Sequence, residues 1–426
     1  MISKRTPVLV IFALFALASL AAANGLNLNG LGTRSQAMGG AFVGIADDFS
    51  AVFWNPAGAA GFRQELFGFN AFDLIPRSTY RQFSEMPGAG IDAKTPTQHY
   101  LGFLGAYYRP IGPKVVVGLG IGTPSGLGTK WDGADFASLS GGTPFDWSSK
   151  IGVFSVTPLV AVKLSDRLSV GATLNVNLGT FNLKRPGGDA DLGEGPVPLG
   201  QYEEQMTGWG FGATFGVLAK PVDKLSIGLT VRTPSTVSFK GSAQLSYLSL
   251  YDLPDSSDLT RKITWPLWIA GGVSFRPVDR LLLSADVHWT QWSKLDRITT
   301  EYLEETWAMF MLEGSLDSIP LYWKNATQLR FGAEYTLNAS TVLRAGYYND
   351  PAPGPDTTLS VLLPSHTYNA FSAGLGKTVG DLRLDFGIEY LAGNTRRGYM
   401  GGYGTDGAPT YGMSIVVPSV SVSYTF

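Results

Sequence analysis

Few side chains in this sequence are of the types that perform covalent chemistry. The 426 residues include three histidines, His99, His288 and His366, and no cysteine. Disulfides, thiolate zinc sites and cysteine nucleophiles are therefore excluded. Serines are abundant, but none lies in a Gly-x-Ser-x-Gly elbow, so a chance serine and histidine pair carries little weight. We predict that the protein has no catalytic residues and is not an enzyme.

Two further motifs are candidate ligand sites. The glycine-rich stretch 118–122 resembles a phosphate-binding loop, but it lacks the G-x-G-x-x-G spacing and no helix is predicted after it. The acidic loop 189–194 has carboxylates that suit a divalent cation, yet it departs from the EF-hand pattern and fits a solvated loop better. We therefore expect no cofactor and no metal.

The composition argues against an ordinary water-soluble protein. Charged residues make up 15% of the chain, compared with ~25% in typical soluble proteins. The aromatic content of 12% excludes intrinsic disorder, and the net charge of −2 gives no basis for nucleic-acid binding. We expect a medium other than water to face much of the surface.

The first residues predict export. Lys4 and Arg5 precede an apolar run over 7–23 that ends in three alanines, the order of a secretory signal peptide cleaved after Ala23. The alternative is a retained membrane anchor, for which the run is slightly short. No later stretch approaches the ~20 apolar residues of a spanning helix. If the mature chain crosses a membrane, it must do so as a closed β-barrel.

Apolar and polar residues alternate with period two in segment after segment. In 168–178, leucine, valine and alanine interleave with serine, glycine, threonine and asparagine, which predicts a strand with one apolar face. The same pattern recurs at 225–232, 281–290, 328–337, 383–390 and 416–426. A soluble β-sandwich also alternates, but its strands average five or six residues rather than about ten. Short turns alternate with long loops along the chain, which favours an outer-membrane barrel.

Pairing the short turns with their flanking strands predicts the topology. Hairpins are expected near residues 98–124, 150–184, 207–240, 262–298, 323–350 and 366–392. With a first strand after Phe62 and a C-terminal strand, they predict an all-β transmembrane antiparallel barrel of about 14 strands over 62–426. Such a barrel has a lumen too wide for wall side chains to fill. Residues 24–61 are rich in small residues and are either a disordered arm or a plug inside that lumen.

Two loops and three arginines are candidate binding groups. Apolar residues on loops that face water must pack against one another as a lid or against a ligand in a capture groove, and the two roles can coexist. These residues are Leu245, Tyr247, Leu248, Leu250, Tyr251, Trp307, Phe310 and Met311. By parity, Arg330, Arg344 and Arg383 point into the lumen, where an arginine binds a carboxylate ligand or pairs with protein acids.

Short motifs along the mature chain carry a family resemblance. They are Gly30-Leu31-Gly32, Gly39-Gly40-Ala41, Ile45-Ala46-Asp47-Asp48, Asn55-Pro56-Ala57, Tyr347-Tyr348-Asn349-Asp350-Pro351-Ala352-Pro353, Leu363-Pro364, Phe371-Ser372-Ala373-Gly374 and Tyr424-Thr425-Phe426. In order and spacing the sequence resembles the FadL/TodX family of outer-membrane transporters for long-chain fatty acids and other hydrophobic molecules.

The resemblance implies a 14-stranded barrel whose N-terminal residues form a hatch, with Asn55, Pro56 and Ala57 near a kink in the third strand that opens the wall sideways. That strand is expected to run from Val115 through Gly122. Its break is expected at Thr123, Pro124, Ser125 and Gly126, because proline cannot donate to a β-ladder and glycine weakens one. The alternative is that Pro124 merely ends the strand.

Together these observations predict a protein of the Gram-negative outer membrane that takes up fatty acids or other hydrophobic molecules, such as aromatic hydrocarbons, passively. Loop capture, lumenal binding and lateral release are the expected steps. The other functions considered are a general hydrophilic porin and a structural or adhesive surface barrel. Lipid, lipopolysaccharide and the hydrophobic solutes are the expected partners, and a monomer is the simplest expectation for a barrel with a complete wall.

Overall fold

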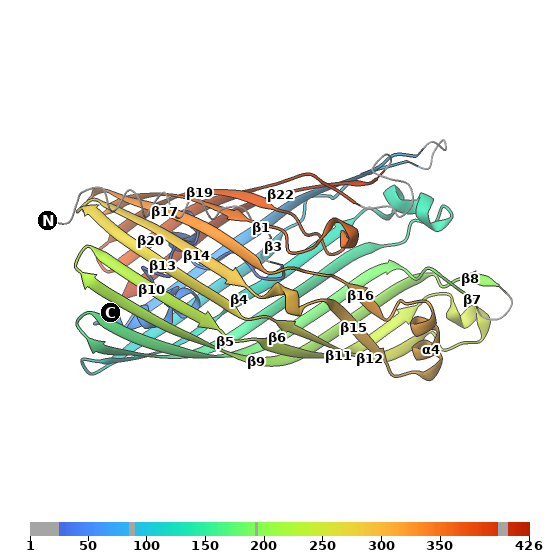
Figure 1. The fold of residues 1–426 in the computed structure, drawn as a ribbon, viewed down its shortest axis with the longest axis horizontal. Coiled ribbons are helices and arrows are strands. Elements are labelled where there is room, and N and C mark those ends of the chain that lie inside the picture. Colours follow the sequence, from blue (N-terminus) through green and yellow to red (C-terminus); the bar gives the residue numbers. More distant parts are fainter. Residues whose placement is uncertain (1–24, 85–89, 192–194, 399–407) are drawn as a thin grey trace.

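The computed structural model describes residues 25–84, 90–191, 195–398 and 408–426. The predicted signal peptide, residues 1–23, lies outside this part of the chain. The described residues form a closed 14-stranded antiparallel β-barrel (Figure 1), as the alternation predicts. The wall closes where the first strand pairs with the last, from Leu66 opposite Thr425 to Arg81 opposite Thr410.

Ten wall strands are single elements and four are interrupted pairs. The single elements are β1 (Leu66–Gln82), β3 (Tyr100–Ile111), β4 (Val115–Trp131), β5 (Trp147–Ser165), β6 (Leu168–Pro186), β9 (Gln201–Val222), β18 (Thr341–Asp350), β19 (Tyr368–Val379), β20 (Leu382–Gly393) and β22 (Thr410–Thr425). The interrupted strands are β10 (Leu225–Arg232) with β11 (Ser235–Leu245), β12 (Ser256–Trp265) with β13 (Trp268–Val278), β14 (Leu281–Thr290) with β15 (Arg297–Tyr302), and β16 (Ser318–Pro320) with β17 (Ala326–Asn338).

Short strands and helices decorate the wall and its ends. The short strands are β2 (Ile91–Lys94), β7 (Asp189–Asp191), β8 (Pro196–Pro198) and β21 (Arg396–Arg397). The helical elements are α2 (Thr33–Ala37), α3 (Ala51–Trp54), η1 (Pro56–Gly61), η2 (Gly133–Ser140), η3 (Leu248–Tyr251), η4 (Trp292–Lys294), α4 (Glu305–Glu313) and η5 (Asp356–Thr358). No helix of the described residues is long and apolar enough to cross a membrane.

Period-two alternation turns the apolar face of the wall outward. On β9, Trp209 and Phe211 are 60% and 63% exposed, whereas Thr214 on the other face is buried. Water would not favour such a belt of exposed aromatic and aliphatic side chains, but lipid does. The outer face of the wall is therefore its membrane face.

The two ends of the barrel differ as expected for an outer-membrane protein. Tight turns, such as the one joining β6 to β5, lie at one end, and the long connections carrying α4, β7 and β8 lie at the other (Figure 1). Strand β9 has 22 residues, about twice the ~9–11 that a tilted strand needs to span a bilayer. The long strands therefore carry the outer loops well beyond the membrane.

The lipid-facing role of the outer face makes a testable prediction. Leu229 on β10 faces outward at 48% exposure. We expect Leu229→Arg to lower the free energy of unfolding by about 2–4 kcal/mol, because it places a charge in hydrocarbon. Denaturant titration of the protein in phospholipid vesicles measures this. Lys240→Arg, at an already charged and exposed position of β11, is the control. Equal stability of the two variants would contradict the conclusion that this face contacts lipid.

Candidate functional site

The lumen is occupied by residues 25–61, called here the N-terminal segment. Its helix α2 packs against β18, β19, β20 and β22, and η1 packs against β5, β6 and β9 on the opposite wall. Asn55, Pro56 and Ala57 are fully enclosed. The Asn55 amide donates to the carbonyls of Val43 and Val217 at 3.0 Å each and accepts from the Ala57 N–H at 3.1 Å. This asparagine thus fixes both the fold of the segment and its contact with β9.

Wall glycines allow the segment to approach the backbone of the barrel. A Cβ added at Gly228 would lie 2.0 Å from the Val43 oxygen, and one at Gly346 would lie 1.9 Å from the Gly39 nitrogen. Because no side chain fits at these separations, glycine is required on the lumen face of β10 and β18. The close contact therefore depends on glycines of the wall as well as on the backbone of the segment.

A buried ion network ties the segment to the wall. Arg34 donates two hydrogen bonds to Glu334, at 2.8 and 3.0 Å, and also pairs with Asp47 within the segment. Glu334 in turn pairs with Arg344 at 2.7 Å. A buried charge that loses its partner is strongly destabilising, so this network holds α2 in place.

The predicted lumenal arginines face inward, as parity requires, but protein groups already occupy them. Arg344 pairs with Glu334 and with Asp385 at 2.8 Å, and Arg383 pairs with Asp385 at 3.2 Å. Arg330 donates to the Gly39 carbonyl at 3.1 Å and to the Gln328 side chain. These arginines therefore hold the N-terminal segment and neutralise the charges of Glu334 and Asp385.

The third wall strand differs from its prediction. Strand β4 does not break at Thr123 to Gly126 and Pro124 does not end it, since it continues to Trp131. Its pairing with β3 nevertheless stops at Leu104 opposite Gly122, and its register with β5 shifts between Gly122 and Ser125. On the other side, β4 resumes its pairing with β5 at Ser125 opposite Val153, so the irregularity there is limited to a bulge. The edge facing β3 is left unpaired over these residues.

Side chains and the N-terminal segment replace the missing ladder. The Thr123 hydroxyl accepts from the Phe103 N–H at 3.1 Å, on the β3 side of the gap. From inside, the Leu28 N–H donates to the Pro124 carbonyl at 3.1 Å, and Asn27 forms an isolated bridge with Ser125. The wall is thus closed at this point by contacts that are weaker and fewer than a regular ladder.

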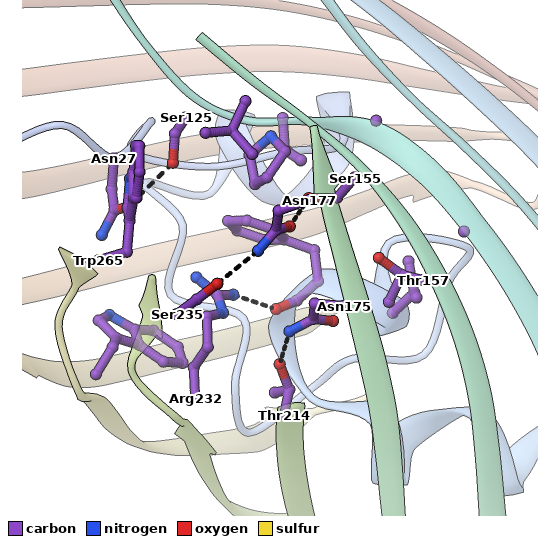
Figure 2. A pocket seen from close by; sticks show the side chains of 18 of the residues that line it. Asn27, Ser125, Ser155, Thr157, Asn175, Asn177, Thr214, Arg232, Ser235 and Trp265 are labelled. Atoms are coloured by element: carbon purple, nitrogen blue, oxygen red, sulfur yellow. Dashed lines mark hydrogen bonds between the residues drawn. The ribbon is translucent and has the colours of Figure 1, made fainter. Parts of the chain in front are cut away.

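A cavity of about 780 Å³ lies between this gap and the far wall (Figure 2). Gly122, Pro124 and Ser125 line it on one side, and Arg232, Trp265 and Trp268 line it on the other. A second cavity, of about 760 Å³, lies across residues 25–30 of the segment, and Asn27 borders both.

The apolar loop residues pack mainly against one another. Leu245, Leu248, Trp307, Phe310 and Met311 are buried in one cluster that closes the outer end of the lumen. Tyr247 and Tyr251 are half-buried, whereas Leu250 is 73% exposed. Mutual packing therefore accounts for most of this set, and the exposed apolar surface here belongs to Leu250 with Leu303, Met309 and Leu312.

Arg232 is the site residue that the sequence reasoning missed. It faces the cavity from β10, and the signal was available in the alternation, which places Arg232 on the inward side of a strand whose outward side is Ile227, Leu229 and Val231. Nothing in the sequence, however, shows that Arg34 and Arg344 pair with carboxylates whereas Arg232 rests on the Phe53 carbonyl and two aromatic rings.

The glycine contacts predict how the segment can be dislodged. Gly346→Ala should displace residues 38–40, because the new Cβ has no space beside Gly39. We expect faster hydrogen exchange across α2 and a higher ionic conductance in planar bilayers. Gly271→Ala is the matched control, since its Cβ would meet nothing nearer than 4.0 Å. Equal exchange and conductance in the two variants would contradict a tightly seated segment.

Comparison with known proteins agrees with this architecture. Residues 10–413 match the family model of outer membrane protein transport proteins (OMPP1/FadL/TodX). The long-chain fatty acid transport protein of Escherichia coli K12 is 22% identical over 407 residues, covering 85% of this chain and 86% of that protein.

Two solved structures share the fold. A Pseudomonas aeruginosa FadL homologue superposes with a TM-score of 0.76 at 19% identity, covering 94% of this chain and 100% of the other. The P. putida toluene transporter TodX superposes with a TM-score of 0.73 at 18% identity, covering 94% and 99%. The chain belongs to the OMPP1/FadL/TodX family of outer membrane transport proteins.

Proposed function

We propose that this protein carries hydrophobic molecules passively across the outer membrane, binding them in the 780 Å³ cavity and releasing them sideways between β3 and β4. The observation that carries the proposal is the lining of the cavity. Gly122, Pro124 and Ser125 border it where β4 has lost its pairing with β3. A ligand in the cavity would therefore lie next to the weakest part of the wall.

Capture at the outer loops is the proposed first step. Leu250, Met309 and Leu312 present apolar surface to the medium, beside a buried cluster that closes the lumen below them. Exposed apolar patches of this kind are interaction sites for hydrophobic partners. In this proposal the buried members, Trp307 among them, form the lid, and the exposed ones meet the solute first.

The N-terminal segment would serve as the hatch. Asn27 and Leu28 hold the free edge of β4 from inside and also separate the two cavities. Movement of these residues would join the cavities and free the edge at the same time. The route avoids an aqueous exit, because an apolar solute partitions favourably into the surrounding membrane.

Fatty acids and aromatic hydrocarbons are the proposed solute classes, after the named activities of the E. coli and P. putida relatives. The passage involves no chemical step on the solute. The outward apolar belt would contact lipid and lipopolysaccharide. A hydrophilic porin is less well supported, since it calls for an open lumen and residues 25–61 cross this one.

The first experiment is ligand binding to the purified protein in detergent micelles. A labelled long-chain fatty acid and a labelled alkylbenzene are titrated against wild type and Thr157→Trp, whose side chain would fill the cavity. We expect saturable binding that weakens at least tenfold in Thr157→Trp. Ser238→Trp, on the exposed outer face of β11, is the control. Absence of saturable binding, together with ion conductance, would favour the porin.

Lateral release makes a separate prediction. Because the chain has no cysteine, the double variant Phe103→Cys with Thr123→Cys can lock β3 to β4 across the gap. Oxidation should abolish uptake into vesicles while leaving ligand binding intact, and reduction should restore uptake. Tyr107→Cys with Leu119→Cys joins the same strands where they are already paired and is the control. Unimpaired uptake by the oxidised Phe103 and Thr123 variant would exclude this exit.

A further inference from the structure

The wall has a second break, on the seam that joins β12 and β13 to β14 and β15. Strand β12 pairs with β15 at only three positions, the last of which is Arg261 opposite Thr300. Pairing resumes at Trp268 opposite Thr290, between β13 and β14. The residues between these two pairs form no ladder in the described structure, and this interval is called here the seam break. It comprises residues 262–267 and 291–299.

The two edges of the seam break differ in length, and the longer edge folds inward. Pro266 on the shorter edge has no N–H to donate to a ladder. The longer edge forms the turn η4, in which Trp292 is buried, and Leu295 behind it is buried as well. Both pack in one apolar cluster with Ile263 and Trp265 of the facing edge. The seam break is therefore sealed on its lumen side by side chains.

The seam break lies where the apolar belt of the outer face ends. Toward the short turns, the first outward pair is Ile269 opposite Trp289, and both side chains are half-buried. Beyond them Val273 and Val287 are 37% and 38% exposed on the membrane face. A tryptophan at the edge of such a belt is typical of the membrane interface. The seam break, toward the end that carries α4, is therefore at the level of the lipid head groups (Figure 1).

Lysines gather on the outer side of the seam break. Lys262 lies on its β12 edge and Lys294 lies on the facing edge, and both are exposed. Lys240 on β11 is exposed on the same face and is a diagonal neighbour of Lys262, because Ser238 is opposite Lys262 and Lys240 is opposite Thr260. Two edges of the wall and one adjacent strand thus present ammonium groups at one place.

The protein does not neutralise these three lysines. None of them pairs with a carboxylate in the part of the chain that the structure describes. The acids nearby in the chain have other partners, since Asp296 pairs with Arg297 at 3.6 Å and Glu301 accepts from the Thr260 hydroxyl at 3.0 Å. Clusters of lysine and arginine at head-group level attract anionic lipid head groups. The complement of this surface is therefore an anion that the membrane supplies.

We propose that a phosphorylated glycolipid of the outer leaflet, of the lipopolysaccharide type, binds over the seam break. Its phosphates lie among Lys240, Lys262 and Lys294, and its acyl chains lie on Val273 and Val287. Charge-assisted hydrogen bonds from the ammonium groups to phosphate oxygens hold the head group. The bound lipid covers from outside an interval of the wall that has no ladder. This inference does not depend on the transport function proposed above.

The test is native mass spectrometry of the purified, delipidated full-length protein in detergent. Diphosphoryl lipid A, monophosphoryl lipid A and phosphatidylethanolamine are titrated against wild type and the triple variant Lys240→Gln, Lys262→Gln and Lys294→Gln. We expect wild type to bind diphosphoryl lipid A at least threefold more tightly than the monophosphoryl form and at least tenfold more tightly than phosphatidylethanolamine. The triple variant should lose at least tenfold in affinity for diphosphoryl lipid A.

The matched control removes the same number of exposed lysines at the opposite end of the barrel. These are Lys114→Gln, Lys220→Gln and Lys224→Gln, near the short turns. We expect this variant to bind diphosphoryl lipid A within twofold of wild type. Heat-modifiable migration in electrophoresis checks that each variant is a closed barrel.

The outcomes that would overturn the inference are distinct. Equal affinity of wild type and the seam-break variant for diphosphoryl lipid A would exclude these lysines, and equal loss in both triple variants would reduce the effect to overall charge. Equal affinity of wild type for lipid A and phosphatidylethanolamine would exclude phosphate recognition. Displacement of lipid A by an equal concentration of inorganic phosphate would assign the surface to free phosphate. Solute binding is not measured here, so failure of the transport proposal would leave these results unaffected.

Discussion

Inside a bilayer no water is available to bind a free peptide N–H or C=O, so every backbone group of a membrane wall needs a partner from the protein. This requirement closes β1 on β22 and keeps the ladder nearly continuous around the barrel. The same requirement applies where the ladder between β3 and β4 ends, at Leu104 opposite Gly122. There the Thr123 hydroxyl and the Leu28 backbone supply the bonds that a regular strand would have made.

The width of the barrel creates the second constraint, because a ring of this many strands cannot fill its own centre. The N-terminal segment fills it, and the contacts that hold it are of two kinds. Lumen-facing glycines such as Gly228 and Gly346 let backbone meet backbone, and the network of Arg34, Glu334 and Arg344 anchors α2 electrostatically. Residues 27 and 28, which close the gap in β4, lie outside that anchor, so the segment combines a fixed part with a more lightly held one.

These two constraints meet at the cavity. It exists because the segment does not occupy the whole lumen, and it borders β4 because the bulge there pulls the strand out of register. The interior is mixed in character, with apolar side chains beside polar pairs that satisfy one another. Arg232 faces this space from β10, where the rings of Phe53 and Trp268 and the Phe53 carbonyl hold its guanidinium.

The sequence alone determined the wall. Alternation of the kind seen in 168–178 depends only on which face of a strand meets lipid, and strand number follows from turns such as Asn338–Ala339 that are local in the chain. The inward direction of Arg330, Arg344 and Arg383 followed from the same parity. Of the two readings of Pro124, the one in which it ends the third strand is wrong, since a proline is tolerated at a bulge and β4 resumes its pairing with β5 beyond it. The kink at Thr123 to Gly126 stays a prediction.

Only the tertiary structure decided which charges are paired. Arg34 and Glu334 are 300 residues apart, and no local pattern reports that they share two hydrogen bonds. The same is true of the loop residues, whose burial depends on whether distant segments such as 245–248 and 307–311 meet over the lumen. Parity shows which way a side chain points, because that is a property of the strand, whereas the partner it finds across the lumen is a property of the closed barrel.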